Sequence, residues 1–515
     1  MQFGSTKCTQ MVAQLLATFL MSLFIVIASS SEAAATQISA AAAIVPPAKI
    51  PWIAFDDGGD RIGVNNAETV ITPSTVRKLA LLWSVTTPNV VDSSVVVLPG
   101  VQTPSGMRDL LFVTTDAGSL LAIDANTGVL VWHQDTQGPV LTNSAPAIDP
   151  VSQRYVYSYG LDGKIHKYEV GTGTEITQGW PVTVTLEPGL EKGSATLNVS
   201  NKYLYMTLSS GTGDRGHYVG HVVAINLASA QMSVFNALCS DKRELLFTDS
   251  TRSNYCPDVG GGIWARGGVV VDSVTGNVFF TVGNGTYNAN KGGHDYGDTV
   301  LELTPDLGTI VDTYTPTDYD ALNRNDYDLG SEAPLLLPKQ STSNTPFMLV
   351  QVGKDQSIRL LNRQNLSGQG GPNHVGGELQ VIKNSIYLGY THPLVWNDAN
   401  NTTWVFVADD LATYAYKVVT DAAGHSSLQL VYQTGRSSSP FIANGVLFLQ
   451  DYKAVLALDP TTGSVLWKAT QSSGSIQNRH WQSPVVVNGH LYFTDNNIYN
   501  HSNQSGHLYA YGINA

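Results

Sequence analysis

The chain has 515 residues, a formal net charge of −13 and only 13% charged residues, with 48 glycines and 23 tyrosines. The net charge is negative, and the sequence has no basic patch with interleaved aromatic residues. These two features exclude a general nucleic-acid binder. Plentiful glycine and tyrosine, with short runs of β-branched residues, are typical of many short strands joined by turns, as in an all-β propeller or barrel.

The first 35 residues predict an export signal. Lys7 provides the positive end, residues 11–28 form a mostly apolar core, and the small residues of SSSEAAA follow at 29–35. An uncleaved membrane anchor is the alternative, because the apolar run approaches the length that spans a bilayer. We therefore expect a secreted, extracellular protein that has no membrane attachment after cleavage. Residues 36–50 are predicted to be a disordered lead-in, and residues 51–515 a single domain.

A repeated hairpin organises the rest of the chain. Residues 118–132 (GSLLAIDANTGVLVW) predict a strand, a tight turn closed by Gly128, and a second strand that ends in Trp132. The same spacing returns at residues 454–467 (AVLALDPTTGSVLW), which ends in Trp467. Further, weaker copies lie between them, and counting their aromatic ends gives eight units. Seven units is the alternative, because the sixth copy has lost its aromatic residue.

The two ends of the repeat array complement each other. The last unit (GHLYAYGINA, residues 506–515) stops before its final strand, whereas the first strand (LALLW, residues 79–83) has no hairpin partner of its own. In a ring the N-terminal strand can complete the last unit and remove both exposed sheet edges. The predicted fold is an all-β, eight-bladed propeller of four-stranded antiparallel blades, closed by the N-terminal strand.

Two cysteines remain once the signal is removed together with Cys8. In an oxidising compartment we expect Cys239 and Cys256 to form a disulfide that closes one long loop, with two free thiols as the alternative. A glycoprotein is also expected, because seven Asn-x-Ser/Thr sequons fit a secreted protein with many surface loops. They lie at Asn198, Asn284, Asn365, Asn400, Asn401, Asn500 and Asn503.

The repeats resemble those of the quinoprotein alcohol dehydrogenase-like β-propellers. The shared pattern is Ala-x-Asp-x-x-Thr-Gly-x-x-x-Trp at residues 122–132 and 457–467. Three further stretches are similar to the same family, at residues 52–83, 260–287 and 353–380, and the first of them is similar to the start of polyvinyl-alcohol-dehydrogenase-like proteins. The resemblance implies pyrroloquinoline quinone (PQQ) bound over the channel. It also implies a Ca²⁺ held by a Glu and an Asn, an Asp as base, an Arg on the quinone oxygens and a Trp as floor.

Residues at the openings of the first strands are the candidates for this chemistry, because the first strand of each propeller blade lines the central channel. Glu332 (in GSEAPLLL) is a candidate metal ligand or base, with an ion pair to Arg266 or Lys192 as the structural alternative. Asn143 (in TNSAP) is a candidate for a metal-ligating or cofactor-binding amide, or it caps a turn. Ca²⁺ prefers several oxygen ligands, carboxylates above all.

Arg266 and Trp264, both in GGGIWARGG, are candidates for cofactor binding. The glycines permit close approach, the guanidinium can hold carboxylates in a bidentate manner, and the indole offers a flat surface to a tricyclic quinone. Packing between blades is the alternative for Trp264. Lys192 is a further candidate that could contact a ligand carboxylate, or it lies on a solvated rim. Trp481 (in RHWQSP), at another opening, is also a cofactor-binding candidate.

His392 and Asp258 are candidates for acid–base catalysis. Histidine titrates near neutral pH, although a lone channel histidine is more often a hydrogen-bonded structural residue. Asp258 lies beside Cys256 in a long insertion, where a solvated loop aspartate is the alternative. Two further loops, residues 284–298 and 317–328, are unusually polar and could bind Ca²⁺ or cover the channel mouth; ordinary solvated loops are the alternative.

The sequence thus favours a PQQ-dependent oxidoreductase that acts on alcohol or sugar hydroxyls. It contains neither adjacent cysteines nor a Cys-x-x-Cys-His motif, so electrons would leave to an external acceptor. The alternative is a non-catalytic secreted propeller that uses the same scaffold to bind a glycan or a protein.

Overall fold

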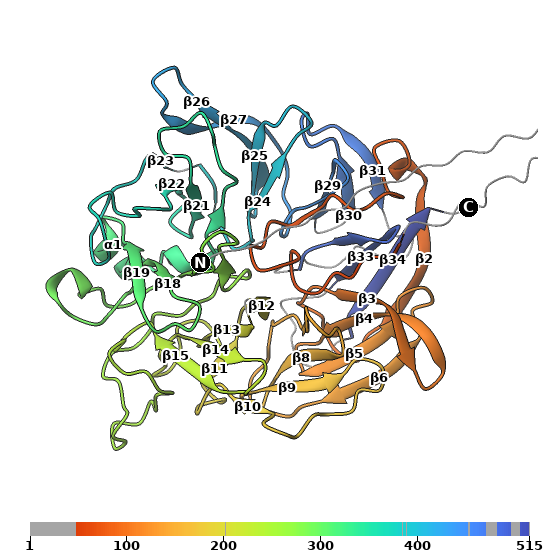
Figure 1. Ribbon diagram of the computed structural model, residues 1–515, viewed down its shortest axis with the longest axis horizontal. Coiled ribbons are helices and arrows are strands. Elements are labelled where there is room, and N and C mark those ends of the chain that lie inside the picture. Colours follow the sequence, from red (N-terminus) through yellow and green to blue (C-terminus); the bar gives the residue numbers. More distant parts are fainter. Residues whose placement is uncertain are drawn as a thin grey trace, which may run out of the picture. The chain divides into compact units, whose positions relative to one another are not determined.

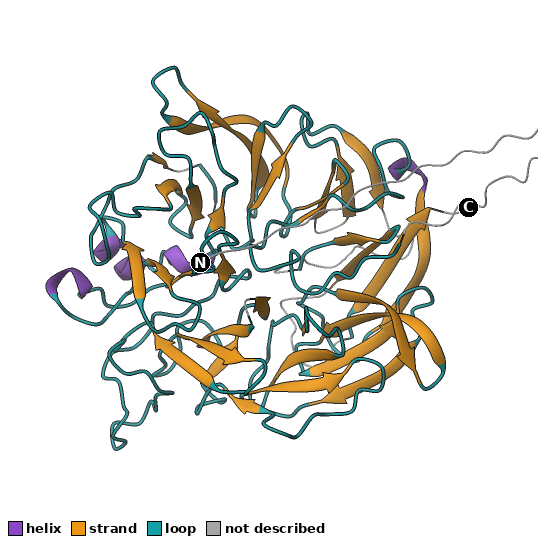
Figure 2. Cartoon of the chain, in the orientation of Figure 1, coloured by secondary structure: helices purple, strands orange, loops and turns teal. Residues whose placement is uncertain are grey.

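Eight antiparallel sheets follow one another around a ring in the computed structural model of the chain (Figure 1). The structure describes residues 48–513, except 201, 384, 388, 452–453, 470–481 and 496–504. The predicted all-β, eight-bladed propeller is confirmed, and so is the count of eight rather than seven. In the described part of the chain, strands and loops make up nearly everything, with one α-helix (Figure 2).

The blades take their strands in chain order. Blades one to four are β3 (Val96–Thr103), β4 (Gly106–Thr114), β5 (Ser119–Asp124) and β6 (Leu130–Asp135); β7 (Ala147–Ile148), β8 (Tyr155–Gly160), β9 (Lys164–Glu169) and β10 (Val182–Thr183); β11 (Glu191–Gly193), β12 (Asn198–Ser200), β13 (Tyr203–Ser210), β14 (His221–Asn226) and β15 (Met232–Asn236); and β16 (Val270–Val271), β17 (Val278–Thr281), β18 (Val300–Leu303) and β19 (Ile310–Tyr314).

Blades five to eight are β20 (Leu335–Leu336), β21 (Met348–Val352), β22 (Ile358–Asn362) and β23 (Gln380–Ile382); β24 (Leu394–Asn397), β25 (Thr403–Ala408), β26 (Ala412–Thr420) and β27 (Ser426–Gly435); β28 (Phe441–Ala443), β29 (Val446–Asp451), β30 (Ala454–Leu458) and β31 (Val465–Ala469); and β32 (Val485–Val487), β33 (His490–Asp495) and β34 (His507–Ile513) with β2 (Leu79–Thr86). The helices are α1 (Tyr319–Asn325) and the 3₁₀ turns η1 (Val76–Lys78), η2 (Ala289–Lys291) and η3 (Leu329–Ser331). None of the helices in the described part is long and apolar enough to cross a membrane.

The ring closes as the sequence predicts. β2 pairs antiparallel with β34, from Leu79 opposite Ile513 to Thr86 opposite His507. The indole N–H of Trp467, in blade seven, donates to the carbonyl oxygen of Leu79 over 3.1 Å. An N-terminal strand therefore completes the C-terminal blade, and the preceding blade is fastened to it.

The recurring motif performs the same task in successive blades. The indole N–H of Trp132 donates to the carbonyl oxygen of Val170 in the next blade over 2.9 Å. A Cβ on Gly173 would lie 2.7 Å from the Trp132 ring, so only glycine leaves room for the indole. Gly173 also has a φ of 71°, which favours glycine. Trp83 packs over Gly128 in the same way. The tryptophan of one blade thus rests on the turn glycine of the next.

A segment before the first blade runs through the centre of the ring. We call residues 52–66, which include β1 (Val64–Asn65), the central strap. Trp52 exchanges two backbone hydrogen bonds of 2.8 Å with Val97, and β1 pairs in parallel with β28. Backbone carbonyl oxygens of the strap also accept hydrogen bonds from the first strands of blades two and four. It therefore fills the axis of the propeller, which the repeat pattern did not predict.

Cys239 and Cys256 form a disulfide in the structure. It closes a loop of the insertion that follows β15, and the predicted pairing is confirmed. Asn198, one of the seven sequon asparagines, is fully buried in β12 and donates its amide hydrogens to the carbonyl oxygens of Gly59 and Val269. A glycan cannot attach there in the folded protein. Asn400 and Asn401 are exposed, whereas Asn500 and Asn503 lie outside the described residues.

Candidate functional site

The two faces of the propeller carry different loops. In an antiparallel blade, the start of the first strand and the end of the second lie on one face, and the end of the first and start of the second lie on the other. Loops after β13, β17 and β21, and the segments that lead into β16 and β20, therefore meet on one face. We call this the carboxylate face, because three aspartates gather there.

Asp214, Asp326 and Asp328 form this carboxylate cluster. One carboxylate oxygen from each lies within 4.8 Å of the others. Asp214 comes from the loop after β13, whereas Asp326 and Asp328 lie between α1 and β20. The side chain of Asp326 is 66% exposed and that of Asp328 only 8%. Three carboxylates so close together repel one another unless a cation joins them.

Asn284, after β17, completes the cluster. Its backbone N–H donates to Asp328 Oδ1 over 2.9 Å, and its amide Nδ2 donates to Asp326 Oδ1 over 3.0 Å. Its amide Oδ1 is buried and accepts no hydrogen bond from the described part of the chain. Three clustered carboxylates and an amide oxygen on a residue bonded to two of them are the kind of oxygen ligands that Ca²⁺ takes, so the residues present fit a hard cation.

Lys354 supplies the positive charge of the site. Its Nζ lies 2.8 Å from Asp326 Oδ1 and 3.3 Å from Asp328 Oδ2. Burial raises the pKa of Asp328 to about 6, although Lys354 opposes this rise. Burial also raises the pKa of Asp214, against the hydrogen bond from the Tyr218 hydroxyl. One lysine thus faces three aspartates, and the cluster remains short of positive charge.

Trp264 packs against this cluster. A Cβ on Gly283 would lie 2.4 Å from Asp328 Oδ1 and 3.0 Å from Trp264 Cδ1, so glycine at this position lets the carboxylate and the indole approach each other. The indole ring also meets Tyr218 edge-on, with ring centroids 6.1 Å apart. Its N–H is buried without a hydrogen-bond partner. An aromatic residue therefore lies directly beside the oxygen ligands.

Arg266, Asn143 and Lys192 meet in a second cluster, deeper in the channel. Asn143 donates its amide Nδ2 to Asp92 Oδ2 and accepts from Lys192 Nζ, each over 2.9 Å. The Arg266 guanidinium donates to the carbonyl oxygen of Asn143 and, over 2.8 Å, to that of Asp92. It also lies over the ring of Phe55 in the strap. The terminal nitrogens of Arg266 are therefore already bonded within the protein.

Glu332 and His392 are also buried in the channel. Within the described residues, neither carboxylate oxygen of Glu332 meets a hydrogen-bond partner, so the alternative ion pair with Arg266 or Lys192 is not formed. Burial raises the pKa of Glu332 well above its ordinary value. The imidazole Nε2 of His392 donates to the carbonyl oxygen of Arg61 in the strap over 2.9 Å, and burial lowers its pKa to about 3. His392 is thus a neutral side chain that holds the strap.

A family model described as outer membrane protein assembly factor BamB matches residues 71–244 and 398–513, together more than half of the chain. The chain belongs to this family of PQQ-repeat propellers. A search of curated proteins found no matching relative.

Solved structures with the same fold include three dehydrogenases. A quinohemoprotein alcohol dehydrogenase from Pseudomonas putida HK5 has a TM-score of 0.62 and 15% identity over 90% of this chain and 80% of its own. The corresponding enzyme from Comamonas testosteroni has a TM-score of 0.61 and 14% identity over the same shares. A europium-containing methanol dehydrogenase has a TM-score of 0.63 and 14% identity over 90% of this chain and 98% of its own. At these identities the likeness establishes the shared propeller fold.

Asp258, a further candidate in this PQQ-repeat chain, is not one of the three aspartates of the carboxylate cluster. Asp258 accepts a 3.3 Å hydrogen bond from the Thr286 hydroxyl and lies beside the Cys239–Cys256 disulfide, whose sulfurs are not free to bind a metal. Trp481 lies outside the described residues. Among the predicted site residues that the structure describes, Trp264 is the one that borders the carboxylate cluster directly.

Sequence reasoning missed Asp214 and Lys354 and did not single out Asn284, Asp326 or Asp328. Asn284 begins the polar loop at residues 284–298, and Asp326 and Asp328 lie at the end of the polar loop at residues 317–328. Asp214 stands in a short turn after β13 (SGTGDRG) that gave no signal of its own. The sequence feature that pointed to the cluster was therefore the high density of polar residues in two loops. That these loops meet in space could be seen only from the folded structure.

Proposed function

We propose that this protein is a PQQ-dependent oxidoreductase that oxidises a hydroxyl group of an alcohol or sugar at the carboxylate face. The observation that carries the proposal is the cluster of three carboxylates beside Trp264, two of which accept hydrogen bonds from Asn284, whose buried Oδ1 has no partner in the described part of the chain. We further propose that the protein is secreted and passes its electrons to an external acceptor.

Three residues would hold the Ca²⁺: Asp214 and Asp328 through carboxylate oxygens, and Asn284 through its amide oxygen. The indole of Trp264 offers an aromatic surface to a planar cofactor, and the Nζ of Lys354 can donate to cofactor oxygens. When bound, PQQ with Ca²⁺ supplies an acceptor for the two electrons that leave the substrate carbon.

Asp326 is suited to take the proton of the substrate hydroxyl. Its side chain is 66% exposed, so a substrate can reach it, and Lys354 Nζ lies 2.8 Å from its Oδ1. Its hydrogen bond from Asn284 Nδ2 fixes one oxygen and leaves the other for the substrate. The proton then rests on the Asp326 carboxylate, at the exposed side of the site.

The test is a titration of the full protein with PQQ and Ca²⁺, followed by dye reduction with alcohols and sugars. We expect saturable PQQ binding at micromolar concentrations. We expect D326N to retain PQQ binding but to reduce turnover by about 10²–10⁴-fold, as for the loss of a general base. D320N, on the exposed face of α1, is the matched control and should be unaffected.

No binding of PQQ at micromolar concentrations would overturn the enzyme proposal. The chain would then be a non-catalytic propeller that binds a glycan or a protein. Full turnover by D326N, with PQQ bound, would instead reject the assignment of the base.

A further inference from the structure

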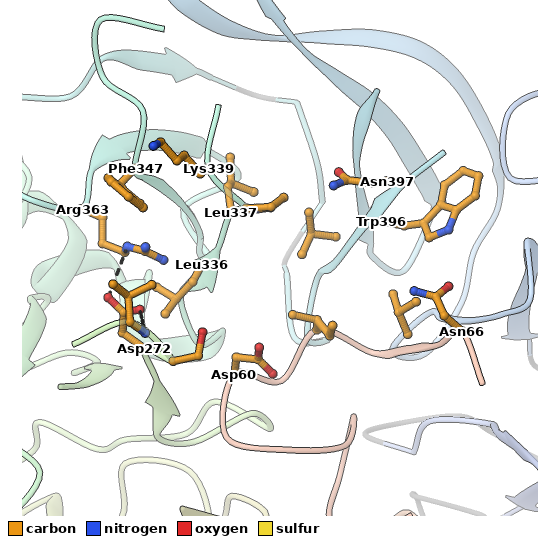
Figure 3. A pocket seen from close by; sticks show the side chains of 16 residues that line it. Asp60, Asn66, Asp272, Leu336, Leu337, Lys339, Phe347, Arg363, Trp396 and Asn397 are labelled. Carbon is orange, nitrogen blue, oxygen red and sulfur yellow. Dashed lines mark hydrogen bonds and ion pairs between the residues drawn. The ribbon is translucent and has the colours of Figure 1, made fainter. Parts of the chain in front are cut away.

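A pocket of about 370 Å³ opens on the face of the propeller opposite the carboxylate cluster (Figure 3). It lies between blades four, five and six, where first strands end, and the strap contributes Asp60, Val64 and Asn66 to its lining. Its volume falls within the range of small-molecule sites, roughly 300–1,000 Å³. The dehydrogenase proposal makes no use of this pocket.

Arg363, just after β22, is the most informative residue of its lining. The residue is only 8% exposed, and its terminal guanidinium nitrogens have no hydrogen bond to the described part of the protein. Its Nε lies 3.6 Å from Asp272 Oδ2, and the guanidinium stands 5.2 Å from the centroid of the Phe347 ring. Asp272 is itself fixed by hydrogen bonds from the Val274 N–H and the Thr275 hydroxyl.

This arrangement leaves the outer edge of the guanidinium for a ligand. Asp272 and Phe347 hold the group in place, and Figure 3 shows Arg363 directed into the pocket. A buried arginine with free terminal N–H groups matches a carboxylate, which accepts two parallel hydrogen bonds from it. Lys339, exposed at the rim, adds a second positive charge on the same side.

The other side of the pocket presents groups of a different kind. Asn66 and Asn397 offer amide donors and acceptors, and Asp60 offers a carboxylate from the strap. Trp396, which is half-buried, and the side chain of Val64 provide apolar surface. Amides and a carboxylate alternating with apolar surface suit a ligand that carries several hydroxyl groups on a carbon ring.

We propose that this pocket binds a saccharide that bears a carboxylate, such as a hexuronate unit. The sugar carboxylate meets Arg363 and Lys339, its hydroxyl groups bond with Asp60, Asn66 and Asn397, and the C–H face of the ring packs on the apolar lining. A phosphorylated ligand fits less well, because Asp60 and Asp272 would repel its higher charge. An apolar ligand would leave the terminal N–H groups of Arg363 without a hydrogen-bond acceptor.

The test is calorimetric titration of the full protein with digalacturonate, and with the neutral disaccharide cellobiose as the matched probe. We expect saturable binding of digalacturonate and at least about tenfold weaker binding of cellobiose. R363Q should lower the affinity for digalacturonate by at least about tenfold, because it removes the charged bidentate contact. R154Q, on an exposed strand connection of blade two, is the control and should bind normally.

K339Q provides a second variant that does not disturb a buried group. We expect it to weaken digalacturonate binding by a few fold and to reduce its dependence on salt. No saturable binding below about 10 mM, equal binding of cellobiose, or unchanged affinity in R363Q would each overturn the proposal. Because D328N alters only the carboxylate face, digalacturonate binding in D328N should be normal whether or not the protein binds PQQ.

Discussion

The two polar clusters of this propeller use similar residues in opposite ways. In the channel, Asp92, Asn143, Lys192 and Arg266 bond with one another and with backbone carbonyl oxygens. At the carboxylate face, three aspartates share one lysine and leave the Oδ1 of Asn284 without a partner. The comparison shows that buried charge by itself does not mark a binding site. A site is indicated where the protein leaves oxygen ligands together and unsatisfied.

The largest expected effect is the loss of the channel network in R266A. Removing one partner from a buried charged network costs about 3–5 kcal/mol in free energy of unfolding, because the remaining groups stay buried without compensation. Urea-induced unfolding measures this loss. R154A is the control: Arg154 pairs with Glu169 at 3.8 Å on the surface, where such a pair contributes under about 1 kcal/mol. Equal losses in both variants would contradict the structural role of Arg266.

At the carboxylate face, by contrast with R266A, we expect the loss of one charged group to leave the free energy of unfolding of the cation-free protein nearly unchanged. D328N should unfold at a similar free energy to the wild type without Ca²⁺, because it replaces a carboxylate that burial disfavours. A bound cation at a hundred times its Kd stabilises the wild type by about 2.7 kcal/mol, and D328N should lose this gain. Thermal unfolding with and without Ca²⁺ measures both quantities, with D320N as control. A Ca²⁺-induced stabilisation that survives in D328N would exclude this cluster as the cation site.

Asp56, in the strap, is expected to make the free energy of unfolding depend on pH. Burial raises its pKa to about 8, so between about pH 4 and pH 8 the native state holds a proton that the unfolded chain has released. Stability from this group is therefore lost as pH rises through that window, at up to about 1.4 kcal/mol per pH unit. We expect D56N to flatten this slope. D135N, on the exposed edge of blade one, should keep the wild-type slope, and an identical slope in D56N would refute the prediction.

The smallest expected effect lies at the outer rim, where contacts are satisfied and uncharged. W132F keeps most of the ring packing but loses the 2.9 Å hydrogen bond to the Val170 carbonyl oxygen. The expected cost is about 1 kcal/mol in free energy of unfolding. W396F is the control, because no such bond to a neighbouring blade is formed by the half-buried Trp396 in the described structure. A larger loss in W396F than in W132F would count against the docking role of the repeated tryptophan.

The channel-facing positions illustrate how far sequence reasoning reached. Arg266, Asn143, Lys192, Glu332 and His392 were placed at the openings of first strands, and the structure does bury all five around the axis. Their partners could not be predicted, because the strap at residues 52–66 enters the channel from a part of the chain without repeats. The backbone carbonyl oxygen of Arg61 accepts the hydrogen bond of His392, and the side-chain ring of Phe55 packs against the Arg266 guanidinium.

The sequence by itself determined the blade and the way the ring closes, and it favoured eight blades over seven. These features depend on short-range patterns: the Asp–Thr–Gly turn, the tryptophan that rests on it, and a first strand that lacks a hairpin partner. The full pattern appears at residues 122–132 and 457–467, and weaker copies between them repeat parts of it. The disulfide followed from the cysteine count in the same direct way.

Only the tertiary structure decided where ligands can bind. Asp214, Asn284, Asp326 and Lys354 come from loops of blades three, four and five and from the connection between blades four and five, and no spacing in the sequence relates them. The pocket at Arg363 likewise needs three blades and the strap to form its walls. Repeats encode the contacts that every blade shares, whereas a site is formed by loops that differ between blades and meet only when the ring is closed.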